Sequence, residues 1–222
     1  MISSPGWTNQ LEDFALQLLQ AVKNHRNESY RKQHRPIIFL GHSLGGLIIK
    51  KALITAHARS CAFSNILEHT KGLVFMGTPH RGADAAKWAA MVQSVLSTTR
   101  MGPDTDLYKD LKERSSTLTQ INNDFPERAA HLQHILSFYE LLVQPELKSL
   151  VVERSSALMG LPNEIPIALN ANHRSMCRFA SADDAAFTAV WKPIRDMIKA
   201  IREGGTRACK FTKTISRKSG ES

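Results

Sequence analysis

The chain has 222 residues, of which 42% are hydrophobic and 22% are charged. These proportions exclude a disordered or fibrous protein and are typical of one soluble globular domain. No apolar run approaches the length of a membrane-spanning helix, and the first residues lack the basic and apolar segments of a signal peptide. The net charge is +9, but no basic stretch is interleaved with aromatic residues, so we expect no nucleic-acid partner.

The cysteines and the last residues indicate the compartment and the domain boundary. Cys61, Cys177 and Cys209 form no close pair, and an odd number of cysteines favours reduced thiols in the cytoplasm. From Arg207 onward the chain carries five Lys or Arg and one Glu, without helical periodicity. We therefore expect a folded domain over residues 1–203 and a basic, disordered tail over 204–222.

The first half of the chain alternates helices and strands. Apolar residues recur every three or four positions over 7–24, which predicts an amphipathic helix, and a basic loop follows over 23–35. Ile37–Leu40 is apolar on both faces, as in a strand at the centre of a parallel sheet. A helix is predicted over 44–58 and a second strand over 72–76.

The second half continues the alternation. Residues 83–133 read as helical segments inserted between strands, and we expect them to form a cap over the substrate. Further strands are predicted at His134–Glu140, at the short Leu150–Val152 and at Ile165–Asn170, before a final helix over 182–202. Strands that alternate with helices predict a three-layer α/β fold with a mostly parallel sheet.

The segment Gly41-His42-Ser43-Leu44-Gly45 lies between the first strand and the following helix. Gly-x-Ser-x-Gly in this context is the nucleophile elbow, a turn so tight that side chains at Gly41 and Gly45 are expected to collide with it. The turn would raise the Ser43 hydroxyl at the carboxyl edge of the sheet. The N–H of Leu44 would then point at the developing oxyanion.

A serine nucleophile needs a base, which in this fold follows the last strand. Of nine histidines, His173 stands there, in "ALNANHRSMCRF". His42 adjoins Ser43, but its side chain is expected to point away from the serine, so we interpret it as a surface or packing residue. His80, at the end of the second strand, is predicted to line the substrate pocket.

The base needs a carboxylate that orients it and stabilises its charged form. Glu140 ends the third predicted strand, and Glu153 follows the short "LVV" segment. We favour Glu140, with Glu153 as its rival and with Glu146 and Glu164 as weaker alternatives. This chemistry requires neither a metal nor a cofactor.

Five motifs together resemble a known family: "GHSLGGLIIKKAL", "GLVFMGTPHRGAD", "SFYE", "VVERSSALMG" and "LNANHRSMCRF". They are similar to lipase-like α/β-hydrolases, in particular to the serine-active-site-containing esterases and to hydrolase domains of fungal NLR-type proteins. The resemblance implies Ser43 as nucleophile, His173 as base and Glu140 or Glu153 as acid. It also implies an ester or lipid substrate, a membrane surface of the mitochondrion or endoplasmic reticulum, and an NLR-type or homotypic protein partner.

The chain departs from this family at its start. Members carry an upstream strand that ends in His-Gly and supplies a second oxyanion donor, whereas this chain begins about one helix before the elbow strand. We therefore expect an N-terminally truncated domain with Ile37–Leu40 at an unpaired sheet edge. The first hypothesis is a serine esterase that forms an acyl-enzyme. The alternatives are a catalytically impaired interaction or signalling module, and a peptidase or thioesterase that uses the same residues.

Overall fold

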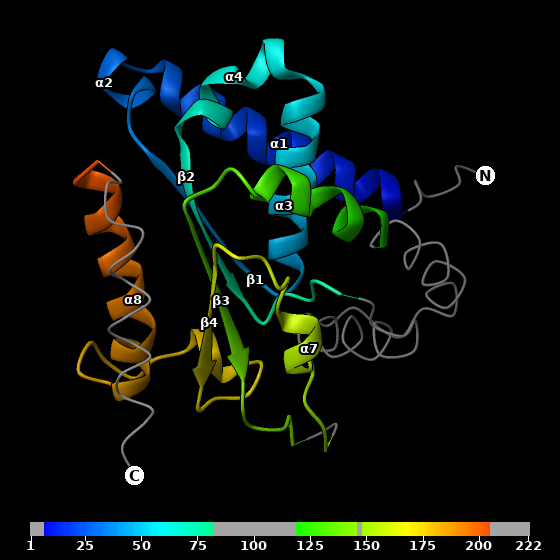
Figure 1. Cartoon of the computed structure of the whole chain (residues 1–222), viewed down its shortest axis with the longest axis vertical. Helices are drawn as coiled ribbons and strands as arrows, with labels where there is room; N and C mark the ends of the chain where they lie inside the picture. Colours follow the sequence, from blue (N-terminus) through cyan, green and yellow to red (C-terminus); the bar gives the residue numbers. More distant parts are fainter. Residues whose placement is uncertain (1–6, 82–118, 146–147, 205–222) are drawn as a thin grey trace.

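The computed structural model describes residues 7–81, 119–145 and 148–204. Within these ranges the centre is a four-stranded sheet in the order β1-β2-β3-β4. Its strands are β1 (Ile37–His42), β2 (Thr70–Met76), β3 (His134–Glu140) and β4 (Glu164–Leu169). Because every pair is parallel, the carboxyl ends of all the strands lie at one edge, marked by the arrowheads in Figure 1.

Helices cover both faces of the sheet (Figure 1). One face packs against α1 (Trp7–Asn27), α3 (Leu44–Ala58), α4 (Ser60–His69) and the helical stretch 119–129. The other face packs against α8 (Ala185–Arg202). The shorter elements are α2 (Tyr30–Gln33), α7 (Arg154–Ala157) and the 3-10 turn η1 (Ser175–Cys177). This is the three-layer α/β arrangement that the alternation of elements predicts.

The pattern of β2 explains why this strand lies inside the sheet. Leu73 and Phe75 belong to the core on the α3 side, and Val74 and Met76 belong to the core on the α8 side. Successive side chains of a strand point to opposite faces, so a run of apolar residues fills both cores. Lys71 is the exposed position of the strand.

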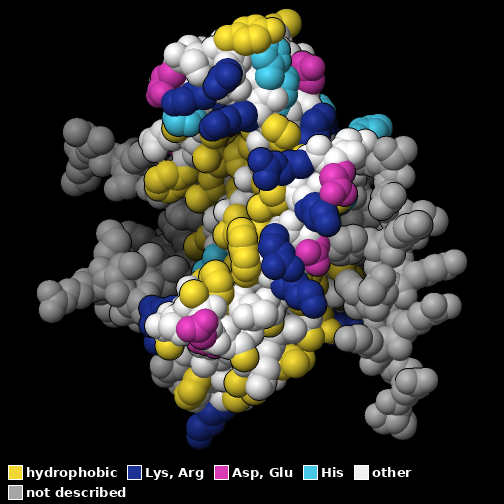
Figure 2. Space-filling model, turned by 90° about the vertical axis from the view of Figure 1, so that its left-hand side faces the viewer, with side chains coloured by type: hydrophobic (Ala, Val, Ile, Leu, Met, Phe, Trp, Pro, Cys, Tyr) yellow, Lys and Arg dark blue, Asp and Glu magenta, His cyan; other side chains and the backbone are white. Residues whose placement is uncertain are grey.

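The outer face of α8 carries four exposed basic residues. Its inner residues Val190, Ile194 and Met197 are buried against the sheet. Its exposed basic residues are Lys192, Arg195, Lys199 and Arg202. Figure 2 shows Lys and Arg side chains along the side of the molecule where α8 lies. The helix is therefore amphipathic, and its basic stripe faces solvent.

Two local predictions are wrong. Leu150–Val152 forms no strand, because the backbone N–H of Val152 donates a hydrogen bond to the Glu140 side chain at 2.7 Å instead of entering a sheet ladder. The predicted loop over 23–35 is largely helical, since α1 continues to Asn27 and α2 follows. The guanidinium of Arg26, buried at the end of α1, donates to Asn65 Oδ1 and to the carbonyls of Gln33 and Arg35, which holds the segment that leads into β1.

The predicted cap is described only at its end. Residues 119–129 are helical, and Phe125 and Ala129 belong to the core on the α3 side, while Ile121 is also buried. This stretch therefore belongs to the layer that covers the sheet. Residues 83–118 and the tail beyond Gly204 lie outside the described residues, so the cap and the tail stay predictions.

The first strand lies at an edge of the described sheet. β1 pairs with β2 and, within the described ranges, with no other strand. The Leu40 side chain is 53% exposed there, as expected for an apolar strand at an edge. None of the helices in the described ranges is long and apolar enough to cross a membrane.

Candidate active site

Ser43 occupies a strained turn between β1 and α3. Its φ of 53° and ψ of −123° lie outside the regions that residues other than glycine readily adopt. Its backbone N–H donates to the Met76 carbonyl at 2.9 Å, which ties the turn to the end of β2. Such strain persists only where the surrounding structure holds it, and it is concentrated at functional sites.

The glycines around Ser43 have different roles. A Cβ atom on Gly41 would lie 2.7 Å from the backbone nitrogen of Gly46, so the close approach predicted at Gly41 is present. A Cβ atom on Gly45 would meet nothing within 4 Å, so the collision predicted there is wrong. The crowded position is Gly46, where a Cβ atom would overlap Thr78. Gly46, and not Gly45, therefore lets α3 approach the segment after β2.

Thr78 contacts the turn and stabilises it. Its side chain is buried, and its hydroxyl lies 3.3 Å from the Ser43 carbonyl and 3.5 Å from the Gly41 carbonyl. A hydroxyl donates to a carbonyl, so Thr78 adds a contact to the Ser43 carbonyl, which also accepts from the Gly46 N–H at 3.1 Å. The packing of Thr78 on Gly46 and its hydroxyl contacts thus hold Ser43 in its unusual conformation.

Leu44 is the first residue of α3. The N–H groups in the first turn of a helix have no acceptor within that helix, and they lie at the positive end of its dipole. The Leu44 N–H is therefore available, next to Ser43, for the oxyanion role predicted from the sequence.

Glu140 and His173 form a buried pair. His173 Nδ1 lies 3.4 Å from Glu140 Oε2, and the side chains are 4% and 0% exposed. The second carboxylate oxygen of Glu140 accepts the hydrogen bond from the Val152 N–H. The two atoms are within ion-pair distance but farther apart than in an ordinary hydrogen bond.

The end of β2 brings Ser43 close to this pair. The carbonyl that accepts from the Ser43 N–H belongs to Met76, the last residue of β2. The next residue is Gly77, where a Cβ atom would lie 2.9 Å from His173 Nδ1. Ser43 and His173 therefore approach consecutive residues at the carboxyl end of β2, and Glu140 ends the neighbouring strand.

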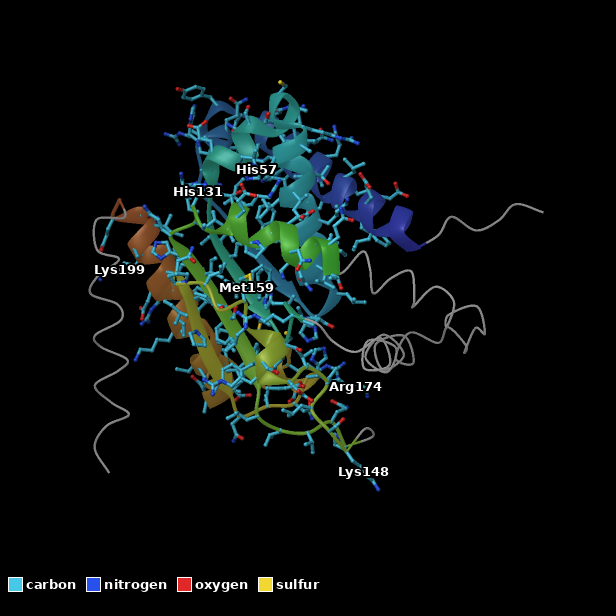
Figure 3. The ribbon with its side chains drawn as sticks, turned by 45° about the vertical axis from the view of Figure 1, so that its right-hand side comes forward. His57, His131, Lys148, Met159, Arg174 and Lys199 are labelled. Carbon is cyan, nitrogen blue, oxygen red and sulfur yellow. The ribbon has the colours of Figure 1, made fainter. Side chains whose placement is uncertain are left out.

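The loop that carries His173 is held by local hydrogen bonds. The Asn172 side chain accepts from the N–H groups of Arg174 and Ser175 at 3.1 and 2.9 Å. The Leu142 N–H donates to the Ala171 carbonyl at 3.2 Å. Figure 3 shows Arg174 at the end of the molecule where the strands terminate, whereas His57 and His131 lie at the other end. The separation agrees with surface or packing roles for those two histidines.

Four buried polar atoms without hydrogen-bond partners lie at this edge, and others in the described chain include both ring nitrogens of His80. Within the described chain, Ser43 Oγ, Glu140 Oε2 and both ring nitrogens of His173 are buried and have no hydrogen-bond partner. Buried polar groups are nearly always satisfied, so each exception needs an explanation. A hydroxyl, an imidazole and a carboxylate with free polar atoms form a candidate site for a ligand with polar groups.

The other carboxylates are placed differently. Glu153 is exposed and immediately precedes α7. Glu164 begins β4 and accepts hydrogen bonds from Ser137 Oγ and from the N–H groups of Met159 and Gly160, as structural carboxylates do. Glu146 lies outside the described residues. The geometry brings Glu140 to His173.

His80 lies on the other side of the sheet from the cluster around Val74 and Met176. Its side chain is buried and contacts the Phe75 ring edge-on, with 4.7 Å between centroids. Burial, followed by the positive charges of Lys50 and Arg81, lowers the pKa of His80 well below its usual value. The described contacts do not bring His80 to Ser43 or His173, and its predicted pocket role stays a prediction.

Lys50 carries a buried amine. The sequence predicts a helix over its position but does not predict its burial. Its side chain is 1% exposed, donates to Asn122 Oδ1 at 2.8 Å and lies over the rings of Phe75 and Phe125. Burial lowers the pKa of Lys50 to about 7.

The described residues contain no group of three His, Cys, Asp or Glu that could hold a metal ion.

A parallel sheet with helices on both faces, a strained serine at the first strand–helix turn and a buried His–Glu pair at the same edge define an α/β-hydrolase. The comparisons with known proteins specify the family. The chain belongs to the family described as "Putative serine esterase (DUF676)", whose model matches residues 8–140.

Curated relatives share this part of the sequence. The chain is 30% identical over 168 residues to Protein SERAC1 of Bos taurus, covering 74% of this chain and 24% of the relative. It is 28% identical over 168 residues to Protein SERAC1 of Homo sapiens, with the same coverage. The chain therefore spans about a quarter of the length of the curated relatives that it matches.

Solved structures of similar fold include a lipase and a hydrolase. The Bacillus licheniformis lipase BlEst2 has a TM-score of 0.48 and 16% identity, and the match covers 73% of this chain and 67% of the lipase. A hydrolase from Pseudomonas aeruginosa has a TM-score of 0.42 and 17% identity, with 83% and 71% covered. The resemblance to fungal NLR-type domains stays a prediction.

Proposed function

We propose that the chain is a serine hydrolase that cleaves carboxylic esters through an acyl-enzyme intermediate. Ser43 is the nucleophile, His173 the general base and acid, and Glu140 the carboxylate that orients His173. The observation that carries the proposal is the meeting, at the carboxyl edge of β2, of a strained serine with a buried His–Glu pair in which Glu140 Oε2 and both His173 ring nitrogens have no hydrogen-bond partner.

In the first half of the reaction, Ser43 Oγ attacks the ester carbonyl carbon while His173 Nε2 takes the hydroxyl proton. The electron pair of the carbonyl moves to its oxygen, and the Leu44 N–H stabilises the resulting oxyanion. When the tetrahedral intermediate collapses, the alcohol leaves with the proton from His173, and the acyl group remains on Ser43. Glu140 stabilises the imidazolium that exists between these steps.

In the second half, water enters the same position. His173 removes a proton from the water as its oxygen attacks the acyl-enzyme carbonyl. The second tetrahedral intermediate then expels Ser43 Oγ, which regains the proton from His173, and the carboxylic acid departs. The cycle restores every residue to its starting state and consumes one water molecule per ester.

An ester with an apolar acyl group suits the surface beside Glu140. Leu141, Leu142 and Val143 directly follow the last residue of β3, and their side chains are 53%, 46% and 51% exposed. Three consecutive exposed apolar residues at the active-site edge are unusual for a purely solvated loop. They favour a lipid or acyl ester over a small polar ester as the substrate class.

A fluorophosphonate probe tests the proposed nucleophile, because it reacts with activated serines. We expect labelling of the wild type and loss of labelling in Ser43→Ala. Ser64→Ala provides the matched control, since Ser64 is an exposed serine on α4, and this variant should label like the wild type. Absence of labelling in folded wild-type protein would refute the hydrolase and favour the interaction module.

A panel of p-nitrophenyl esters, thioesters and peptides then tests the substrate class. We expect hydrolysis of esters, with a preference for longer acyl chains over acetate. Cleavage of peptides alone, or of thioesters alone, would contradict the proposed ester substrate while leaving Ser43 as nucleophile.

A further inference from the structure

The histidine that precedes Ser43 contacts the proposed base directly. His42 Nε2 lies 2.9 Å from the backbone carbonyl oxygen of His173. The two imidazole rings also touch, with 4.8 Å between centroids and an interplanar angle of 38°. We infer that His42 is a positioning residue, which sets the distance between nucleophile and base by holding the backbone of His173. This inference rests on the proposed function.

The direction of the hydrogen bond follows from its chemistry. A carbonyl oxygen can only accept, so His42 Nε2 must carry the hydrogen and donate it. Burial, followed by the neighbouring charge of His173, lowers the pKa of His42, which favours the neutral ring. A neutral His42 that holds its proton on Nε2 keeps the contact while adding no positive charge beside an imidazole that must itself become charged.

The location of His42 makes this contact different from the other restraints on the base. Asn172 holds the His173 loop through its own neighbours, and the Leu142 N–H holds it to the segment after β3. His42 is the last residue of β1 and is bonded covalently to Ser43. Its side chain therefore joins the nucleophile turn to the base loop across 131 positions of sequence.

The contact has a catalytic consequence because proton transfer depends steeply on geometry. A misplacement of about 1 Å can reduce turnover by about 100-fold, even when the change lies outside the reacting groups. Loss of the hydrogen bond would let His173 shift relative to Ser43 Oγ, while the surface that binds the acyl group would not change. The expected loss is therefore in kcat and not in KM.

Three substitutions separate the hydrogen bond from the ring contact. His42→Phe keeps an aromatic ring but removes the donor, His42→Gln offers an amide N–H near the position of Nε2, and His42→Asn offers an amide that is too short to reach. We expect kcat to fall about 10- to 100-fold in His42→Phe and His42→Asn with KM within about twofold of wild type. His42→Gln should restore kcat to within about fivefold of wild type.

Kinetics on a p-nitrophenyl ester, fluorophosphonate labelling rates and thermal unfolding are measured on the same preparations of the 222-residue chain. Equal kcat in all three variants and the wild type would overturn the inference. An equal loss in His42→Gln and His42→Phe would also overturn it, because the donor would then have no role. If His42→Phe does not fold, the comparison of His42→Asn with His42→Gln decides in the same way.

The two proposals fail in different ways. If wild-type protein is folded but neither labels nor turns over ester, the proposed function is refuted and the inference falls with it. If the wild type labels and Ser43→Ala does not, but the His42 variants retain wild-type kcat, only the positioning role is refuted.

Discussion

Replacement of Lys50 by methionine tests the electrostatic consequence of burying an amine in the core behind the elbow helix. The ammonium group has a pKa of 10.5 when solvated, and burial lowers it to about 7. At about 1.4 kcal/mol per pKa unit, this difference corresponds to about 5 kcal/mol of cost for holding the charged form in the folded state. A methionine side chain fills a similar volume without that cost.

The sign of the pH dependence follows from proton counting. Above about pH 7 the folded state releases the Lys50 proton, whereas the unfolded chain keeps it up to about pH 10.5. The unfolded state then binds more protons, so the free energy of unfolding rises with pH, by about 2 kcal/mol between about pH 7 and about pH 8.5. Below about pH 7 both states are protonated, and the folded state carries the full cost.

Urea unfolding followed by circular dichroism at these two pH values measures the effect. The window stays below pH 9, because burial raises the pKa of Cys177 from 9.0 to about 11 and opposes the trend above that pH. We expect Lys50→Met to be more stable than wild type at about pH 7 and to lose the rise of about 2 kcal/mol. The net gain is reduced by about 1 kcal/mol, because Asn122 loses its partner.

Lys51→Met is the matched control. Lys51 is adjacent in sequence and forms a partly exposed ion pair with Glu12 at 3.4 Å, so its removal should leave the pH dependence unchanged. If Lys50→Met and wild type rise by the same amount between the two pH values, the amine is not neutral in the folded state and the reasoning is wrong.

Three further predictions concern the site and its supports. Glu140→Gln should lower kcat about 1,000- to 10,000-fold, because an amide cannot stabilise the imidazolium, whereas Glu153→Gln should stay near wild type; similar losses in both would contradict the assignment of the acid. Gly46→Ala should lose at least about 2 kcal/mol in urea unfolding, because its Cβ overlaps Thr78. Gly45→Ala should fold normally, and the reverse order would refute the packing described here. Arg26→Ala should lower the free energy of unfolding by about 2 kcal/mol, since three acceptors lose a buried donor. A change below about 0.5 kcal/mol would show that the segment before β1 is stable without these hydrogen bonds.

Local pattern was sufficient for much of the fold. The strand His134–Glu140 has the predicted bounds, and β2 was predicted from Gly72 although it begins at Thr70. Both are runs of apolar residues, and the residue types alone predict that both faces of each strand are buried. The false strand at Leu150–Val152 has the same apolar character, but the Val152 N–H has an alternative acceptor in Glu140, which no local pattern reveals.

The sequence by itself determined the tight turn at Ser43 and the order in which the candidate serine, carboxylate and histidine occur along the chain, because those features depend on neighbours within a few residues and on the alternation of strands with helices. Only the tertiary structure decided which carboxylate meets His173, that Gly46 and not Gly45 is the crowded glycine, and that His42 holds the backbone of His173. Each of these depends on atoms far apart in the chain that packing brings within a few ångströms, and the distance between such atoms is not encoded in any single segment.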